Sequence, residues 1–351
     1  MDNIEVSEKK HFEIKKILFF ILRIALAVGI IYYLLYSLDV KQKADFLSGI
    51  KNFNFWWYIP AGLLYLIHLV YGAWRWNLLL KIQKIHLSFM EAFALTMKSF
   101  FLSLVIPGGA LGGDLAKIAF ISKRVKAGTK VEGAFSIIID RITGMIALFA
   151  TSIIVCLCNM PLLIKIGEGS KEIAVGIFLL IAISIFGLVA GIAVFFHRQF
   201  EKVKLFKFFI DLADKYSKGT VKRLFNALDI YKQNPKILIL TTLGSVFFIH
   251  LIMPLLVYVL MQGIGGDFHV KIVDCLSAII LGNTASVVPL FPGGIGLREL
   301  IVREIFAAGG VQEAIATFAA LLYLSVILFF NLIGGIFMFI NFKAENNNKD
   351  S

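Results

Sequence analysis

The sequence predicts an all-α polytopic membrane protein, and three observations support this fold class. Hydrophobic residues make up 59% of the 351 residues, and charged residues only 17%. Several apolar stretches exceed the about 20 residues that a helix needs to cross a bilayer. The chain carries a net charge of +12, and most of its Lys and Arg residues lie between these apolar stretches. We therefore expect a single membrane domain over residues 1–351, without a separate soluble domain.

Six stretches are long and apolar enough to form spanning helices. The Trp-Trp-Tyr sequence at 56–58 and the Trp-Arg-Trp sequence at 74–76 lie towards the two ends of the second stretch. Because Trp and Tyr rings prefer membrane–water interfaces, we interpret these two sequences as aromatic belts. The six expected spans are 17–38, 55–80, 132–158, 173–196, 237–261 and 313–340.

Two further apolar stretches, 90–121 and 273–307, are broken in the middle by Pro-Gly-Gly at 107–109 and at 292–294. The arms of the first stretch would be about 24 Å and about 21 Å long as helices, shorter than a hydrocarbon core of about 30 Å. Each stretch is therefore expected to be a re-entrant hairpin. Two short spanning helices remain the alternative, because the charges of the flanking loops fit both arrangements.

The basic loops define the expected topology. With a cytoplasmic N-terminus, the basic segments all lie inside, as the positive-inside rule requires. They are the Lys- and Arg-rich loops at 81–84 and 123–130, segment 197–236 and the C-terminal tail. Segment 197–236 mixes Phe and Leu with basic residues, which is typical of an amphipathic helix on the inner leaflet. We expect a multi-pass protein of the plasma membrane with both termini in the cytoplasm.

The order helix, broken segment, helix occurs twice, at 55–158 and at 237–340, and the two copies run in opposite directions across the membrane. Such an inverted repeat is a common plan among transporters, whose working site lies where the broken helices meet near the midplane. The sequence therefore predicts a site at the two Pro-Gly-Gly turns.

The turn glycines are the first candidates for that site. Glycine permits a positive φ, and the free N–H groups at the start of the following arm favour an anion such as a lipid phosphate. Close helix packing is the competing interpretation, because glycines spaced by four residues allow helices to approach. The candidate glycines are Gly108, Gly109, Gly293 and Gly294.

Charged residues follow both turns, where charge at membrane depth is costly without a purpose. Asp114 and Lys117 share a helix face and can pair. Arg298 suits bidentate binding of a phosphate, and Glu299 is spaced to pair with Arg303. We interpret Arg303 and Glu304 as exposed near the outer surface. Two more charged candidates, at least one facing the protein interior, are Asp140 and Arg141.

Other kinds of chemistry have little support in the sequence. No catalytic signature, metal-ligand spacing or nucleotide-binding loop is recognisable, so neither a metal nor a cofactor is expected. We interpret His68 and His250 as hydrogen-bonded core residues and the three cysteines as buried thiols. Ser99, Ser103, Asn283 and Ser286 on the hairpin arms are weaker candidates.

At these residues the chain resembles the lysylphosphatidylglycerol synthetase transmembrane family, also described as flippase-like, from about residue 74 to Gly335. The resemblance is carried by Pro-Gly-Gly-Ile-Gly-Leu-Arg-Glu at 292–299, Asp-Arg at 140–141 and the first Pro-Gly-Gly turn followed by Gly-Gly-Asp at 112–114. The chain is similar to the membrane region of the multiple peptide resistance factor, and we expect the chain to lack that protein's soluble aminoacyl-transferase domain.

The resemblance implies handling of a phosphate-headgroup lipid, either an anionic or aminoacylated phospholipid or a polyprenyl-phosphate lipid. In that interpretation Lys117, Arg141 and Arg298 neutralise the phosphate, while Asp114, Asp140 and Glu299 orient them or bind a cationic headgroup. Two alternatives remain open: an enzyme acting on a lipid-linked substrate, and a scaffold for a lipid-synthesising partner enzyme. Homo-oligomers are compatible with each function, and nucleic acid is not an expected partner.

Overall fold

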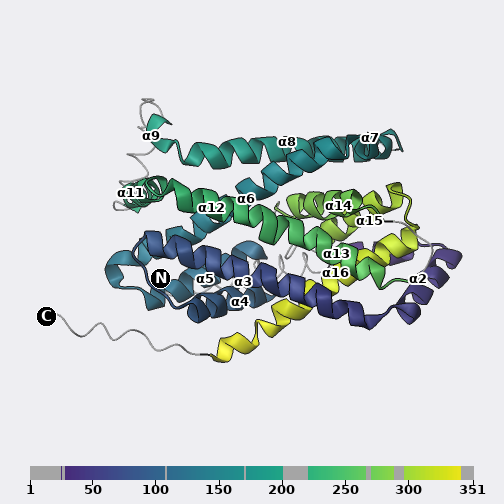
Figure 1. The fold of residues 1–351 in the computed structure, drawn as a ribbon, viewed down its shortest axis with the longest axis horizontal. Helices are drawn as coiled ribbons and strands as arrows, with labels where there is room; N and C mark the ends of the chain where they lie inside the picture. Colours follow the sequence, from purple (N-terminus) through teal and green to yellow (C-terminus); the bar gives the residue numbers. More distant parts are fainter. Residues whose placement is uncertain are drawn as a thin grey trace, which may run out of the picture.

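The structure, a computed structural model, describes residues 25, 28–106, 109–169, 171–200, 220–265, 270–287 and 296–340. Within these ranges all regular secondary structure is helical, and no strand occurs (Figure 1). The all-α class expected from the sequence is confirmed.

Five helices in the described part of the chain are long and apolar enough to cross a membrane. They confirm five of the six expected spans, and the first, 17–38, lies largely outside the described residues. The five are 3-10 turn η1 with α3 (Phe55–Ile82), α6 (Lys130–Cys158), the Ala174–Val194 part of α8 (Lys171–Val194), Pro235–Gln262 and Glu313–Phe339. Pro235–Gln262 comprises α12 (Pro235–Ser245), the π-helical turn η3 (Val246–Leu251) and α13 (Ile252–Gln262), and Glu313–Phe339 comprises α16 (Glu313–Ile333) and η5 (Ile336–Phe339).

Each broken segment folds as two helices that lie against each other. The first pair is α4 (Phe89–Val105) and α5 (Ala110–Arg124), and the second is α14 (Ile272–Ala285) and α15 (Leu297–Ala308). In the first pair the two outer ends are joined by an ion pair between Glu91 and Arg124, so the helices run antiparallel. The longest arm, α4, has 17 residues and is about 26 Å long, below the about 30 Å of a hydrocarbon core.

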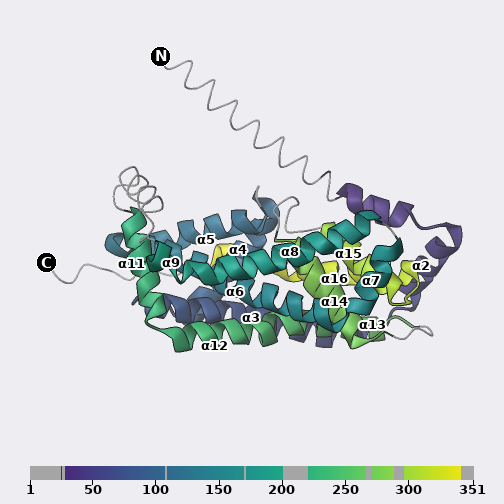
Figure 2. The same cartoon turned by 90° about the horizontal axis from the view of Figure 1, so that it is seen from above.

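The two helix pairs extend into the molecule from opposite ends of α6. Near the start of α6, a Cβ on Gly133 would lie 3.4 Å from the Ile121 side chain in the last turns of α5. Just past the end of α6, Asn159 donates hydrogen bonds to Asp274 and Ser277 at the start of α14. Figures 1 and 2 show the pairs in opposite halves of the long axis. Their connected ends therefore meet near the middle of α6.

Helix contacts in one half of the chain have counterparts in the other. The contacts α3–α4, α5–α6 and α4–α16 correspond to α13–α14, α15–α16 and α14–α6. An inverted repeat requires such matching contacts. The division into repeats 55–158 and 237–340 agrees with this packing and stays a prediction, as do the topology and the cytoplasmic termini.

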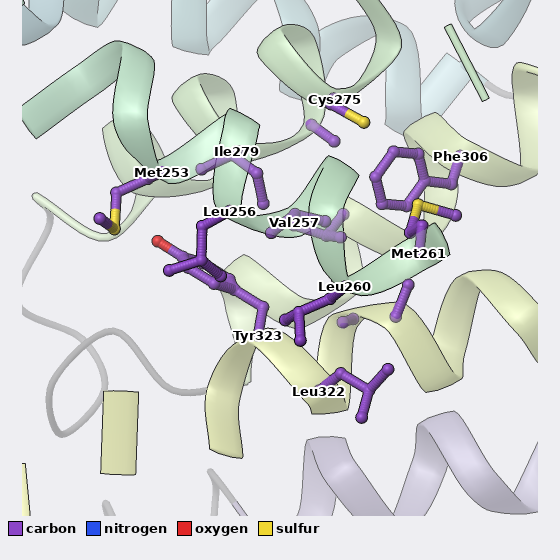
Figure 3. Packing of buried hydrophobic residues seen from close by; sticks show 14 of the residues in the cluster. Met253, Leu256, Val257, Leu260, Met261, Cys275, Ile279, Phe306, Leu322 and Tyr323 are labelled. Atoms are coloured by element: carbon purple, nitrogen blue, oxygen red, sulfur yellow. The ribbon is translucent and has the colours of Figure 1, made fainter. Parts of the chain in front are cut away.

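The largest buried apolar cluster lies around the second helix pair. Side chains of α13, including Leu256 and Leu260, pack against Cys275 of α14, Phe306 of α15 and Tyr323 of α16 (Figure 3). This packing holds α14 and α15 in place by removing apolar surface from the solvent. The three cysteines are free thiols. Cys156 and Cys275 are buried as expected, whereas Cys158 is exposed at the end of α6.

The remaining helices lie at the periphery. They are α2 (Val40–Asn52), α7 (Met160–Gly169), α9 (His197–Phe200) and α11 (Thr220–Lys232). On α11, Ala227, Leu228 and Tyr231 are buried while Arg223 is exposed, so this helix is amphipathic. Residues 201–219 of the expected amphipathic segment 197–236 lie outside the described residues.

Candidate functional site

The ends of the two helix pairs meet at two adjoining cavities of about 270 and 410 Å³. Ala110 at the start of α5 and Asn283 near the end of α14 line both, as does Arg141 from the middle of α6. The cavities therefore lie between the two broken segments, where the sequence predicts a site, and their functional role stays a prediction. Pro107, Gly108 and residues 292–294 lie outside the described residues, so the expected roles of Gly108, Gly293 and Gly294 stay predictions.

Arg141 reaches from α6 to the first helix pair. Its Nη2 donates a 2.9 Å hydrogen bond to Oδ1 of Asp114, its Nε contacts Oδ2 at 2.5 Å, and Nη2 also lies 3.3 Å from the Ala110 carbonyl oxygen. The pairing of Asp114 with Lys117 that the sequence allows does not form. Arg141 offers a planar fork that matches both carboxylate oxygens, which the single ammonium of Lys117 cannot do.

Lys117 has an unusual environment for a cation. Its residue is only 5% exposed, its Nζ lies 3.8 Å from the centre of the Trp76 ring, and it lines the larger cavity. In the part of the chain that the structure describes, no carboxylate lies within ion-pair distance of it. The aromatic face stabilises the ammonium electrostatically, while Asp114 and Asp140 act on it only from beyond ion-pair distance.

Arg75 is a site residue that the sequence interpretation missed. Its Nε donates to Oδ1 of Asp140 at 2.8 Å and its Nη1 to Oγ of Ser245 at 2.8 Å, with Arg75 and Asp140 both buried. The sequence around it was interpreted as an interfacial belt, but α3 continues to Ile82 and Trp76 is fully buried. The signal that could have found Arg75 is an ionisable residue inside an apolar helix, which marks a functional position.

At the second helix pair, Arg298 and Glu299 are paired and buried. Arg298 Nη2 lies 2.6 Å from Oε1 of Glu299, and Oε2 of Glu299 accepts from the backbone N–H of Gly296 at 2.5 Å. Gly296 has φ 101°, a conformation that favours glycine. The guanidinium of Arg298 also lies over the Tyr323 ring, 5.0 Å from its centre. This part of the site is therefore held rigidly by charge, backbone geometry and aromatic contact.

The expected pair between Glu299 and Arg303 is wrong. Arg303 is 5% exposed and contacts Glu304 at 2.6 Å and Glu313 at 3.2 Å, so it is neither free nor at the surface. Glu299 instead binds Arg298 through Oε1 and the backbone N–H of Gly296 through Oε2.

Two glycines of the first helix pair have structural roles, in conformation and in packing, and the expected anion-binding role stays a prediction. Gly109 has φ 57° at the start of α5, as the turn requires. Gly113 lies so close to α4 that an added Cβ would be 2.5 Å from the Ser99 carbonyl oxygen. The first turn thus depends on glycine for its conformation, and the helix pair depends on glycine for its packing.

The two histidines differ. Nε2 of His250, within the π-helical turn, lies 3.1 Å from the Gly144 carbonyl oxygen, which confirms it as a hydrogen-bonded core residue. Nδ1 of His68 is buried without a hydrogen-bond partner among the described residues, and His68 lines both cavities. The expectation for His68 is therefore wrong. Among those same residues, no group of three or more His, Cys, Asp or Glu is arranged to hold a metal ion.

The charges around the cavities leave one cation in excess. Arg75, Arg141 and Arg298 each pair with a carboxylate, whereas Lys117 does not. Each carboxylate is thereby engaged by an arginine. The described part of the site therefore offers a net positive charge of one unit to whatever occupies it.

Long apolar helices around a buried charged cavity define an integral membrane protein of the polytopic helical class. The family model described as the lysylphosphatidylglycerol synthase TM region matches residues 20–335. The chain belongs to this family. It is also similar to a UPF0104 membrane protein of Pyrococcus horikoshii, with 26% identity over 294 residues that cover 81% of this chain and 86% of the relative.

Proposed function

We propose that the protein binds a lipid with a phosphate headgroup between its two helix pairs and assists the movement of that lipid between leaflets. The observation that carries this proposal is Lys117, a buried cation without an acidic partner in the described chain, lining a cavity at membrane depth. A phosphodiester has one negative charge, which matches the excess charge of the site. The plasma membrane and cytoplasmic termini are part of the same proposal.

The physical barrier to lipid exchange is the loss of water around the headgroup charge. Moving an unpaired ion into an apolar medium costs several kcal/mol or more. Cationic side chains already fixed in position by Asp114, Asp140 and Glu299 replace that water without reorganising. The cavity thus lowers the barrier for an anionic headgroup, and no nucleotide-hydrolysis step is part of the mechanism.

The exposure of Arg141 indicates the route of entry. Its side chain is 43% exposed although it lies about 17 Å along α6 from the start of that helix. Leu111 and Leu115 on the neighbouring α5 are exposed apolar residues, 56% and 66%. The contacts of Arg141 with Asp114 and Ala110 engage Nε and Nη2, and a guanidinium has five N–H donors, so this exposed group can bind an anionic headgroup in addition to its carboxylate. We infer that the headgroup enters sideways between α5 and α6 while its acyl chains stay in the bilayer.

The test is leaflet exchange of fluorescent phosphatidylglycerol in proteoliposomes, comparing wild type with Lys117→Gln. Lys123→Gln is the matched control, because Lys123 lies in the last turn of the same helix, α5. We expect Lys117→Gln to slow exchange at least about tenfold, since hydrogen bonds to charged groups contribute about 1.5–3 kcal/mol. The control should exchange lipid at the wild-type rate.

Equal rates for wild type and protein-free vesicles would contradict the transport proposal. The scaffold alternative would then be examined by isolating the protein with a lipid-synthesising partner enzyme, and the enzyme alternative by following chemical change in the lipid. If Lys117→Gln exchanges lipid at the wild-type rate, Lys117 does not take part in lipid exchange.

A further inference from the structure

The matching helix contacts give α5 a counterpart in α15, and the two helices differ in exposure. On α5 the apolar residues Leu111 and Leu115 are exposed. Within α15, which the structure describes completely, no residue is exposed. Part of the cover over α15 is the helical segment 28–36, which we call the gate helix. The side of α15 that corresponds to the open side of α5 is therefore closed.

The gate helix lies along α15 from the first turn of that helix. A Cβ on Gly296, where α15 begins, would lie 3.2 Å from Cβ of Ile30. Further along α15, the guanidinium of Arg303 lies 5.8 Å from the centre of the Tyr33 ring. The same guanidinium donates a 2.9 Å hydrogen bond to Oγ of Ser37, which directly follows the gate helix. Figure 2 shows the gate helix in purple at the edge of the molecule, before α2.

The gate helix lies next to the helix that borders the smaller cavity. Arg298 lines that cavity and follows Gly296 by two residues. Tyr323 of α16, whose ring contacts Arg298, lines the cavity as well. Movement of the gate helix away from α15 would therefore bring lipid to the start of α15 without unfolding the second helix pair.

The contact between the gate helix and the rest of the protein is narrow. Leu34 is fully buried, whereas Tyr32 and Tyr36 are exposed. Lipid tails are as apolar as leucine, so an apolar helix that leaves its neighbour in a bilayer loses packing but little hydrophobic stabilisation. The hydrogen bond from Arg303 to Ser37 is therefore important for holding the gate helix in place.

The neighbouring helix α2 is held more firmly. The ring of Phe46 on α2 packs edge to face against Phe318 of α16, with 5.6 Å between the ring centres. A Cβ on Gly49 of α2 would lie 3.3 Å from the Phe318 side chain. The gate helix and α2 are separated by residues 37–39, which are not helical. These three residues thus connect a narrowly held helix to a fixed one, as in a hinge.

We propose that the gate helix closes a second lateral portal, beside α15, and that it opens by turning about residues 37–39. The lipid enters between α5 and α6 from one leaflet and leaves beside α15 into the other, because the two helix pairs extend from opposite ends of α6. Arg303 acts as the latch through Ser37. This inference rests on the proposed function, since only a lipid in transit needs a second portal.

A reversible cross-link tests whether the gate helix must move. Tyr33 and Glu304 both contact the guanidinium of Arg303, so cysteines at these two positions are within reach of a bis-methanethiosulfonate reagent that dithiothreitol cleaves. Cys158→Ser removes the exposed native thiol from the background. The cross-link should slow phosphatidylglycerol exchange in proteoliposomes at least about tenfold, because it raises the barrier to exit, and cleavage should restore the rate.

Two controls accompany the cross-link. The single variants Tyr33→Cys and Glu304→Cys, treated with the same reagent, should exchange lipid as fast as the same variants without reagent. Dihexanoyl phosphatidylglycerol should bind the cross-linked protein as tightly as the uncross-linked protein, because the headgroup enters between α5 and α6. Loss of this binding on cross-linking would overturn the assignment of the gate helix to the exit.

Ser37→Ala tests the latch, because it removes the hydrogen bond from Arg303. We expect exchange to become about three- to tenfold faster, as the loss of one hydrogen bond to a charged group predicts. Ser48→Ala is the matched control, because Ser48 is an exposed residue of α2 that binds Asn52, and it should exchange lipid at the wild-type rate. A Ser37→Ala rate equal to that of wild type would overturn the latch.

Movement of the gate helix can also be measured directly, by the distance between two spin labels. One label is attached to native Cys158, which is exposed at the end of α6, and the other to Tyr32→Cys. Addition of dihexanoyl phosphatidylglycerol should produce a second distance. The control pair, Cys158 with Leu47→Cys on α2, should keep one distance because α2 stays in place.

Different outcomes overturn different proposals. If the cross-linked protein exchanges lipid as fast as the uncross-linked protein, the gate is wrong and the transport proposal stands. If no variant exchanges lipid faster than protein-free vesicles, the transport proposal is wrong, and the spin labels decide about the gate helix. A single unchanged distance between the labels then overturns the gate as well, whereas a second distance in the presence of phosphatidylglycerol supports a gate that responds to lipid binding.

Discussion

Arg75 on α3 and Asp140 on α6 form a buried ion pair, with 2.8 Å between Nε and Oδ1. The same guanidinium donates to Ser245 at the end of α12, where the π-helical turn begins. A Cβ added to Gly144 would lie 2.9 Å from Nη1 of Arg75, so glycine leaves the room that the guanidinium occupies. One side chain thereby joins three long helices and fixes a wall of the larger cavity, which both Arg75 and Asp140 line.

Breaking this pair should destabilise the protein strongly. Asp140→Leu leaves Arg75 buried without its carboxylate, a change that typically costs about 3–5 kcal/mol. Thermal unfolding in detergent measures the effect. The double variant Arg75→Met with Asp140→Leu removes both charges and should recover much of the loss. A double variant less stable than Asp140→Leu would show that the pair contributes more than mutual charge compensation.

The sequence pointed to the residues around these cavities but not to their pairings. The sequence predicts that at least one of Asp140 and Arg141 faces the interior, because charge inside an apolar helix needs a partner. In the structure Asp140 contacts Arg75 of α3, and Arg141 contacts Asp114 of α5. The partners themselves lie 65 and 27 residues away. Spacing along one helix suggested Asp114 with Lys117 and Glu299 with Arg303. Asp114 pairs instead with Arg141 of another helix, and Glu299 with its neighbour Arg298 on the same helix, because arginine binds a carboxylate through two donors.

The helix pairs were predictable for a different reason. Pro-Gly-Gly interrupts an apolar stretch locally, so the break and the short arms could be read from adjacent residues. Trp76 was placed at an interface because aromatic residues are common there, yet its Nε1 donates to Ser136 inside the protein at 3.0 Å. Sequence alone does not separate a buried aromatic residue from an interfacial one, since both lie near the end of an apolar run.

Gly113 should be essential for packing of the first helix pair. In Gly113→Ala the new Cβ would lie 2.5 Å from the Ser99 carbonyl oxygen and 3.0 Å from Cβ of Ser103, so α4 and α5 must separate. We expect a loss of about 1–3 kcal/mol in stability and slower lipid exchange, measured by thermal unfolding and by the proteoliposome assay.

Gly176→Ala is the matched control for Gly113→Ala. Gly176 is also helical, in α8, and a Cβ there has nothing within 4 Å. The control should be as stable as wild type or slightly more stable, because alanine favours helices. If the two alanine variants unfold at the same temperature, close approach of α4 and α5 is not required.

Trp76 should contribute to lipid exchange by stabilising the ammonium of Lys117, and its loss should slow exchange less than the loss of Lys117 itself. Trp76→Phe weakens the cation–π contact and removes the hydrogen bond to Ser136, each worth about 1 kcal/mol. The exchange rate should fall severalfold, less than in Lys117→Gln. Ser136→Ala removes the hydrogen bond alone and separates the two contributions. A Trp76→Phe variant slower than Lys117→Gln would indicate that the indole acts mainly through packing of the cavity wall.

Entry between α5 and α6 predicts where a bound headgroup is found. A phosphatidylglycerol analogue with a photoreactive group near its phosphate should label peptides of α5 around Leu111, which lines the larger cavity, and unlabelled phosphatidylglycerol should compete. Phe178 on α8 is also exposed and apolar, 69%, but it lines neither of the two cavities, so labelling there should be weak and not competed. Arg141→Gln should reduce labelling of α5, with unfolding temperature measured in parallel because the change leaves Asp114 without its partner. The entry route would be wrong if labelling were spread equally over α5 and α8, or if Arg141→Gln in a folded variant left the labelling unchanged. The guanidinium of Arg141 would then serve to hold α5 against α6, and the headgroup would enter elsewhere.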